Sequence, residues 1–315
     1  MTGGFLARRL LGTLAVLVLL SIGVFGLLYL APGSVEQTLQ GSRPASPEAL
    51  AAIRARYHLD DPVVVQYLRW LGGVLQGDFG TSIRTGIPVT EAIGSRLPLT
   101  LELIGYGTLL ATLIGLPLGV IGAFRRGRAA DRAAVVTAVA GMSAPPFAVG
   151  LVLLMAFAVY LQWFPVYGEG EGFADRIRHL TLPAAALAVG SAGLLVRFTR
   201  AALIRELDQD HLVFARARGL PNRLIVHYAL RNSLIPILTA LGLILTSTLA
   251  GTVLVEVTFA LPGLGTLLVD SVTFKDMPVV QALALLLTLL ISAVNLLVDV
   301  GYTLADPRIR FGASR

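Results

Sequence analysis

Reactive side chains are scarce in this chain of 315 residues. It has no cysteine, which excludes disulfides, thiol catalysis and cysteine-based metal sites. The four histidines, His58, His179, His211 and His227, are spaced too widely to form a recognisable ligand cluster. A phosphate-binding loop needs Gly-Lys followed by Ser or Thr, whereas the only lysine, Lys275, lies between phenylalanine and aspartate. We therefore expect no catalytic, cofactor-binding or metal-binding site on this chain.

A few charged residues interrupt otherwise apolar segments. Glu102 and Glu256 lie toward one end of such segments. A charge at the centre of a bilayer costs about 2.5–3.5 kcal/mol, so these residues invite a functional hypothesis. They face either a polar translocation path or one another's helices, and the sequence leaves both alternatives open. A proton-coupled carrier usually needs a chain of titratable groups near the membrane centre, and none is visible here.

The elements that position these residues are membrane spans. The chain is 55% hydrophobic and 14% charged, and its apolar residues are gathered into long blocks. A helix needs roughly 20 mostly apolar residues to cross the hydrocarbon layer. Backbone groups within lipid must be satisfied inside their own segment, which predicts an all-α fold. Six segments meet the length, at 10–31, 97–124, 133–161, 180–203, 233–257 and 279–305.

The arginines predict the orientation of these six transmembrane helices. They gather before the first span, at 125–132, between 200 and 231, and after residue 307. Cytoplasmic loops carry the excess of positive charge, so these parts are expected to be cytoplasmic, together with both termini. The segment 32–96 balances six arginines against six acids. The net charge of +6 therefore reflects topology, and no nucleic-acid partner is needed to explain it.

We expect four regions: 1–31 with the first span, an extracytoplasmic segment 32–96, a core 97–305 and a cytoplasmic tail 306–315. The segment 32–96 is too long for a bare connection and should fold locally. Ser46-Pro47 and Asp61-Pro62 are helix start signals, and Gly77 follows the second helix. That second helix is amphipathic. It serves either packing on the bilayer surface or other helices, or docking of an external partner.

The segment 204–232 is polar and basic and lies between two spans, so we expect a cytoplasmic loop. Its alanines favour a helix, Gly219 is a stop signal and Pro221 follows it. These features predict a short helix followed by a turn. Small residues allow close backbone approach, which suits insertion into a groove on another protein.

Many ordered motifs resemble one family along the whole chain. The chain is similar to the inner-membrane permeases of the dipeptide, oligopeptide and nickel branch of ATP-binding-cassette importers, with a type I permease fold. In that family, the connection between the fourth and fifth spans carries the coupling helix. The matching stretches are His58-Leu59-Asp60-Asp61-Pro62, Gly77-Asp78-Phe79-Gly80-Thr81-Ser82, Arg96-Leu97-Pro98-Leu99-Thr100-Leu101-Glu102-Leu103, Ala215-Arg216-Ala217-Arg218-Gly219-Leu220, Arg231-Asn232-Ser233-Leu234-Ile235-Pro236, Glu256-Val257-Thr258-Phe259 with Pro262-Gly263-Leu264-Gly265, Asp276-Met277-Pro278, Asn295-Leu296-Leu297-Val298-Asp299 and Asp306-Pro307-Arg308-Ile309-Arg310.

One departure concerns the coupling motif. The wider importer pattern places a glutamate and two alanines before the glycine, whereas Val213, Phe214 and Ala215 occupy those places here. This branch commonly lacks that glutamate, so we read no defect. The departure leaves open which residue anchors the loop electrostatically.

The resemblance implies a subunit that forms half of a pore in a bacterial plasma (inner) membrane. Expected partners are a second similar permease, two ATPase subunits that bind ATP and magnesium, an extracytoplasmic binding protein and the lipid bilayer. The expected coupling residues are Phe214, Ala215, Arg216, Ala217, Arg218, Gly219 and Leu220. Candidates for the pore or outer gate are Glu102, Glu256, Phe259, Pro262, Gly263 and Gly265.

The cargo is not determined by the sequence. Peptides are the first expectation, with nickel, glutathione or another small solute as alternatives. A carrier working alone would not need the large basic loop at 204–232. A membrane-embedded enzyme would need a convergent catalytic set, which the spans lack.

Overall fold

The computed structural model describes residues 3–30, 46–56 and 58–305. Every extended regular element in these ranges is a helix, and the only strand-like pairing among them is an isolated bridge between Thr81 and Pro88. The all-α prediction is therefore confirmed. The expected tail at 306–315 and the first part of the extracytoplasmic segment 32–96 lie outside the described residues.

The chain divides into two compact units. The first unit comprises Leu101–Leu261 and the described part of Ala293–Arg315. The second comprises the described part of Thr2–Thr100 together with Pro262–Ser292. Each unit thus joins segments that are far apart in the sequence, so the residues of a site must be assigned to a unit before they are grouped.

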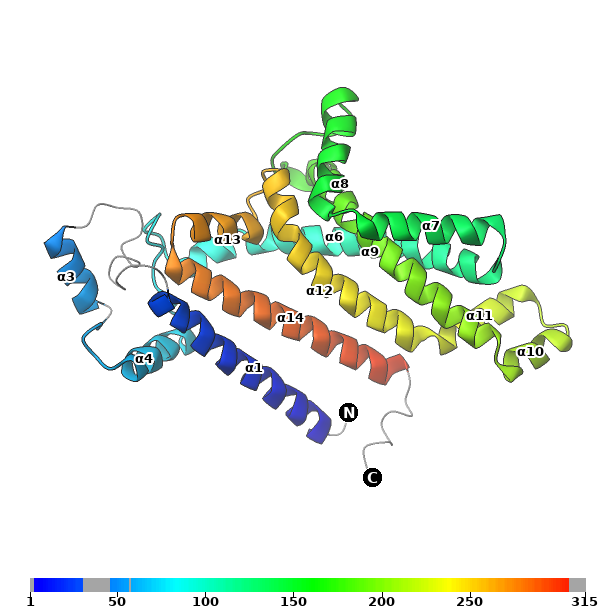
Figure 1. Cartoon of the computed structure of the whole chain (residues 1–315), viewed down its shortest axis with the longest axis horizontal. Helices are drawn as coiled ribbons and strands as arrows, with labels where there is room; N and C mark the ends of the chain where they lie inside the picture. The colour runs from blue at the N-terminus through cyan, green and yellow to red at the C-terminus, as the bar shows by residue number, and fades with distance from the viewer. Residues whose placement is uncertain (1–2, 31–45, 57, 306–315) are drawn as a thin grey trace. The chain divides into compact units, whose positions relative to one another are not determined.

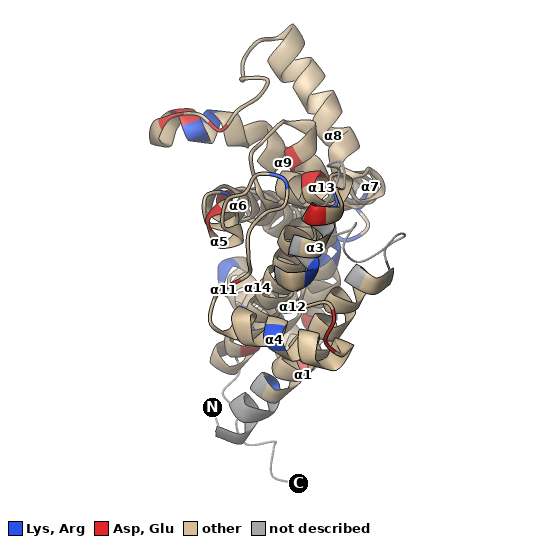
Figure 2. Ribbon diagram, turned by 90° about the vertical axis from the view of Figure 1, so that its left-hand side faces the viewer, with Lys and Arg blue, Asp and Glu red and all other residues tan. Residues whose placement is uncertain are grey.

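Four helices in the described residues are long and apolar enough to cross a membrane. They are α6 (Leu97–Phe124), α9 (Gly172–Leu207), α12 (Leu234–Thr258) and α14 (Met277–Ala305). Figure 2 shows that most of the helical ribbon carries neither acidic nor basic residues. Each helix covers one of the six expected spans. The helix α1 (Gly3–Leu30) covers the first, although its described apolar part, Leu11–Leu27, is shorter than the others. The count of six spans and the side of the termini remain predictions.

The segment 133–161, expected as one span, is broken in the structure. Helix α7 (Ala129–Ser143) ends before a bend of 101°, and α8 (Pro146–Leu153) then continues into a π-helix, Leu154–Tyr160. Figure 1 shows α7 and α8 pointing in different directions. Proline lacks an amide hydrogen and disfavours helical backbone in the preceding residue, so Pro145 and Pro146 explain the break.

Helix α9 is the centre of the first unit and packs against α7, α8 and α12. Its neighbours approach closely at glycines. A Cβ atom on Gly193 would lie 2.5 Å from the carbonyl oxygen of Ala138 in α7, and one on Gly115 of α6 would lie 2.8 Å from that of Ala192. Small residues allow membrane helices to pack backbone against backbone. Substituting either glycine would therefore push the helices apart.

The second unit contains four shorter helices besides α1: α3 (Pro47–Arg56), α4 (Val63–Leu75), α5 (Val89–Gly94) and α13 (Leu264–Thr273). The helices α3 and α4 follow the two proline start signals, and Gly77 with φ +82° follows α4 as expected.

The amphipathic helix α4 packs on α1. The ring of Phe25 lies 5.5 Å from that of Tyr67 and 5.6 Å from that of Trp70, and the Tyr29 hydroxyl donates to the Gln66 side chain. Of the alternatives for this helix, the structure shows packing on another helix.

Candidate functional site

The candidate coupling segment consists of two short helices after α9. Helix α10 (Asp210–Ala217) is followed by Gly219 with φ +77°, and α11 (Asn222–Asn232) leads toward α12. The amide of Leu220 donates to the carbonyl of Ala215, which closes the turn. Glycine adopts this left-handed conformation without steric cost. The predicted short helix with a glycine stop is therefore confirmed, and Figure 1 shows α10 and α11 side by side at the end of α9.

An apolar cluster fixes the inner face of this segment. Leu212 of α10 and Ile225 of α11 are buried against Leu203 and Leu207 of α9. Leu220 is partly buried and packs against the same cluster. The two short helices are thereby attached to the end of α9 by their apolar sides.

The expected coupling residues lie mostly on the outer face. Phe214 is 67% exposed, although it is a large apolar side chain. Ala215 and Leu220 are partly buried. The remaining expected residues, which are exposed, are Arg216, Ala217, Arg218 and Gly219.

A polar cluster joins the three helices of this region. The Nδ2 atom of Asn232, at the end of α11, donates to Oε1 of Glu206 in α9 at 2.7 Å. The same carboxylate oxygen lies 3.0 Å from Nε2 of His211 in α10. Glu206 therefore anchors the loop to α9 through Asn232 and His211. The sequence had left open which residue anchors the loop. Asn232 lies within the matched stretch 231–236, which was the available signal, whereas no local pattern pointed to Glu206.

A second ion pair lies where α7 begins. Two guanidinium nitrogens of Arg200 in α9 donate hydrogen bonds to the carboxylate of Asp131, one of them at 2.8 Å. The amide of Gly127 donates to the same carboxylate at 2.9 Å. Asp131 is buried. Sequence reasoning used Arg200 only as an indicator of topology and missed this pair. A lone acid among Arg125, Arg126, Arg128 and Arg132 was the signal that could have found it.

The two intramembrane glutamates differ in their surroundings. Glu102, in the first turns of α6, accepts a hydrogen bond from Arg176 of α9, and both side chains are partly exposed. The partner of Glu102 thus lies on α9 and not on α12, the helix of Glu256, and a role in the translocation path stays a prediction. Glu256 is fully buried within α12. Phe259 is also buried and lies against Gly150 of α8.

A different arrangement holds the segment between α12 and α14, in the second unit. The amide of Leu264 at the start of α13 donates to the hydroxyl of Thr100 at 2.9 Å. Asp276 is 2% exposed and accepts hydrogen bonds from the amides of Ile83 at 3.0 Å and Arg84 at 3.3 Å, and from the Ser82 hydroxyl. Two motifs that are separate in the sequence therefore form one contact. Helix α13 itself was not predicted.

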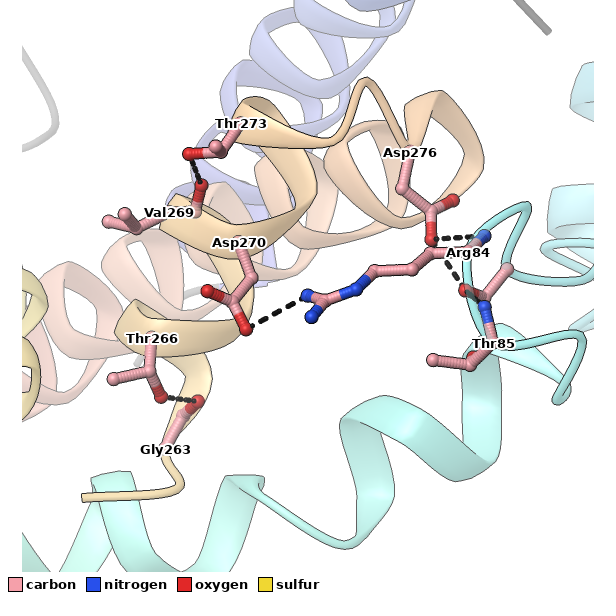
Figure 3. Close-up of polar contacts among 9 residues, drawn as sticks. Arg84, Thr85, Gly263, Thr266, Val269, Asp270, Thr273 and Asp276 are labelled. Atoms are coloured by element: carbon pink, nitrogen blue, oxygen red, sulfur yellow. Dashed lines mark hydrogen bonds and ion pairs between the residues drawn. The ribbon is translucent and has the colours of Figure 1, made fainter. Parts of the chain in front are cut away.

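Figure 3 shows the side chain of Arg84 extending toward Asp270. Its guanidinium lies 3.1 Å from a carboxylate oxygen of Asp270 in α13 and 3.9 Å from the ring centroid of Phe274. The turn 82–85 therefore contacts this segment at two places: Asp276 forms the buried base, and Asp270, within α13, forms the exposed rim.

The six residues expected at a pore or gate are divided between the units. Glu102, Glu256 and Phe259 belong to the first unit, whereas Pro262, Gly263 and Gly265 belong to the second. In the second, Pro262 is exposed, and both glycines are buried at the start of α13. The described residues contain no group of three or more histidines and acids that could hold a metal ion.

Comparisons with known proteins agree with one another. Residues 115–311 match the family described as binding-protein-dependent transport system inner membrane component, and residues 3–104 match its N-terminal family. The oligopeptide transport system permease protein AppB of Bacillus subtilis is 40% identical, with 98% of this chain and 99% of AppB covered. The dipeptide transport system permease protein DppB of Escherichia coli is 36% identical, with 97% and 98% covered.

A solved structure shows the same fold. The inward-facing MetNI methionine ABC transporter has a chain that matches with a TM-score of 0.53 and 19% identity, covering 67% of this chain and 97% of that one. The matched families account for most of the sequence, and the relatives match over nearly their full lengths. The chain therefore belongs to the inner membrane components of binding-protein-dependent transport systems.

Proposed function

We propose that this chain is a permease subunit of an ATP-driven importer of di- and oligopeptides. A binding protein delivers the peptide, a second permease completes the pore, and two ATPase subunits bind ATP and magnesium. The family assignment supports the role in transport, and the relatives named for oligopeptides and dipeptides support the cargo. ATP hydrolysis takes place on the partner subunits.

The coupling segment supports the link to the ATPase. Its inner face is fixed to α9 through Leu212, while Phe214 and Ala217 remain uncovered. A large exposed apolar side chain beside small residues suits insertion into a groove of a partner. In the proposed mechanism, ATP-driven closure of the two ATPases pushes this segment and switches the pore between its inward- and outward-facing states.

Bulky substitutions test this coupling role. We expect Ala217→Trp to abolish peptide uptake while the protein still inserts into the membrane, because the indole would hold the segment out of the groove. Ala133→Trp, at an exposed position of α7, is the matched control and should leave uptake nearly unchanged. Unchanged uptake in Ala217→Trp would exclude the proposed docking face.

The cargo is tested on the reconstituted complex with its binding protein. Short peptides should stimulate ATP hydrolysis, and nickel should not. Stimulation by nickel alone would replace the peptide cargo with a metal. Uptake by this chain without any ATPase would identify a carrier that works alone.

Residues 262–276, which we call the outer segment, support a second role. We infer that residues 262–276 contact the binding protein or the peptide, since Pro262, Val272 and Phe274 are exposed on a segment that is otherwise fixed in place. Photo-cross-linking from Val272 should reach the binding protein or a trapped peptide. Cross-links to lipid alone would contradict this placement.

A further inference from the structure

A small hollow in the first unit is not used by the proposed coupling mechanism. It has a volume of about 240 Å³ and lies between the ends of α6 and α9, the α6–α7 connection and α10. Three arginines and one acid line it: Arg126, Arg128, Arg216 and Asp208. The rest of its lining is apolar and includes Phe124 and Leu207, the last residues of α6 and α9.

The charge of this hollow is unbalanced. Asp208 lies 3.1 Å from Arg126, which accounts for one arginine. Neither Arg128 nor Arg216 makes a side-chain hydrogen bond or ion pair with any residue that the structure describes. Two guanidinium groups thus line one hollow without an acidic partner among the described residues, and the charges of the lining side chains sum to +2. Guanidinium groups bind phosphate oxygens with strong, charge-assisted hydrogen bonds.

The position of the hollow favours a lipid as the source of that phosphate. Helices α6 and α9 are both long enough to span the membrane, and their last residues border the hollow. The end of a spanning helix lies at the level of the headgroups, and basic pockets between such helices on the cytoplasmic side bind anionic headgroups. The apolar residues Phe124 and Leu207 can contact the part of the lipid next to its phosphate.

We propose that this hollow binds the headgroup of an anionic phospholipid. Arg216 belongs to α10, so the bound lipid connects the membrane surface directly to the coupling segment. The binding itself needs only the hollow. Its effect on coupling rests on the proposed function, because it requires α10 to be the segment that the ATPase moves.

Native mass spectrometry of the purified full complex tests the binding. We expect the complex to retain phosphatidylglycerol in preference to phosphatidylcholine. The double variant Arg128→Gln/Arg216→Gln should weaken this retention roughly tenfold or more, since it removes two charged hydrogen-bond donors. Arg132→Gln/Arg223→Gln removes the same charge from exposed positions outside the hollow and should retain the lipid like the unmodified complex. The mass of each complex shows whether the variant assembles.

Several results would overturn the proposal. Equal retention of the two lipids, or unchanged retention in the first double variant, would exclude a specific lipid site. Displacement of the lipid by millimolar inorganic phosphate would assign the hollow to a free anion.

The effect on coupling is measured separately in nanodiscs. ATP hydrolysis stimulated by loaded binding protein should be higher with phosphatidylglycerol than with phosphatidylcholine alone, and the first double variant should lose this difference. Lipid binding without any stimulation by loaded binding protein would reject the proposed function and leave the lipid site standing. Full stimulation without lipid preference would leave the proposed function standing and reject the effect of the lipid on coupling.

Discussion

The coupling segment and the outer segment are built alike but held differently. Each is a short helix region that follows a long apolar helix. The coupling segment packs on α9 through an apolar face, and its polar contact between Glu206 and Asn232 is exposed to solvent. The outer segment is fixed by the buried carboxylate of Asp276, which takes hydrogen bonds from a turn nearly two hundred residues earlier.

This difference indicates which segment can move. Apolar contacts are non-directional and tolerate sliding, whereas a buried carboxylate is costly to leave without its donors. The coupling segment can therefore shift on α9 while staying packed. The outer segment is expected to keep its shape, because any rearrangement at Asp276 would strand a charge and two backbone amides.

The largest expected effect is at Asp276. Asp276→Ala removes the acceptor for Ile83, Arg84 and Ser82, and should lower the free energy of unfolding by about 3 kcal/mol. Thermal denaturation in detergent and protease cleavage at the turn measure the loss. Asp78→Ala is the control, because that exposed carboxylate accepts only the amide of Gly80 in the described contacts. Equal losses in the two variants would contradict the clamp at Asp276.

A smaller loss is expected at the base of α7. Asp131→Ala leaves Arg200 and the amide of Gly127 without their acceptor, and should cost about 2 kcal/mol. The matched control is Asp208→Ala, which breaks the exposed pair with Arg126 and should cost less than about 1 kcal/mol. Unfolding in urea measures both. A larger loss of unfolding free energy in Asp208→Ala than in Asp131→Ala would show that burial does not determine the strength of these ion pairs.

At the coupling segment we expect little loss of stability and a clear loss of coupling. Glu206→Ala should cost about 1 kcal/mol, since apolar contacts still hold α10, but it frees the ends of α10 and α11 from α9. Hydrogen exchange of the α10 amides should become faster. The amount of peptide transported per ATP hydrolysed should fall. Glu206→Gln keeps an acceptor for Asn232 and should restore part of the loss; without this rescue, the anchor depends on charge alone.

The smallest effect is expected at the rim of the outer segment. Arg84→Gln removes an exposed ion pair with Asp270 and a contact with the ring of Phe274, which should cost about 0.5 kcal/mol. Differential scanning fluorimetry measures the loss of stability, with Arg96→Gln, at another arginine of the same region, as the control. A loss as large as that of Asp276→Ala would mean that the rim, and not the buried base, fixes the segment.

Local features of the molecule were predictable from the sequence. Long apolar blocks specify the four spanning helices, since a bilayer imposes a minimum length on them. Pro47 and Gly219 mark a helix start and a helix stop, because their backbone preferences act on adjacent residues only. The alanines and glycine of 215–220 predicted a short helix and its end for the same reason.

Only the tertiary structure decided the contacts between distant parts. Nothing near Asp276 in the sequence specifies Ser82 as its partner, and nothing near Glu206 specifies Asn232. The same holds for Leu220, which the coupling motif includes and which packing turns inward. Helix periods and turn signals carry no information on which distant donor meets which buried acceptor. That choice is made when the helices pack, because each buried polar group must then find a partner or pay the cost of losing water.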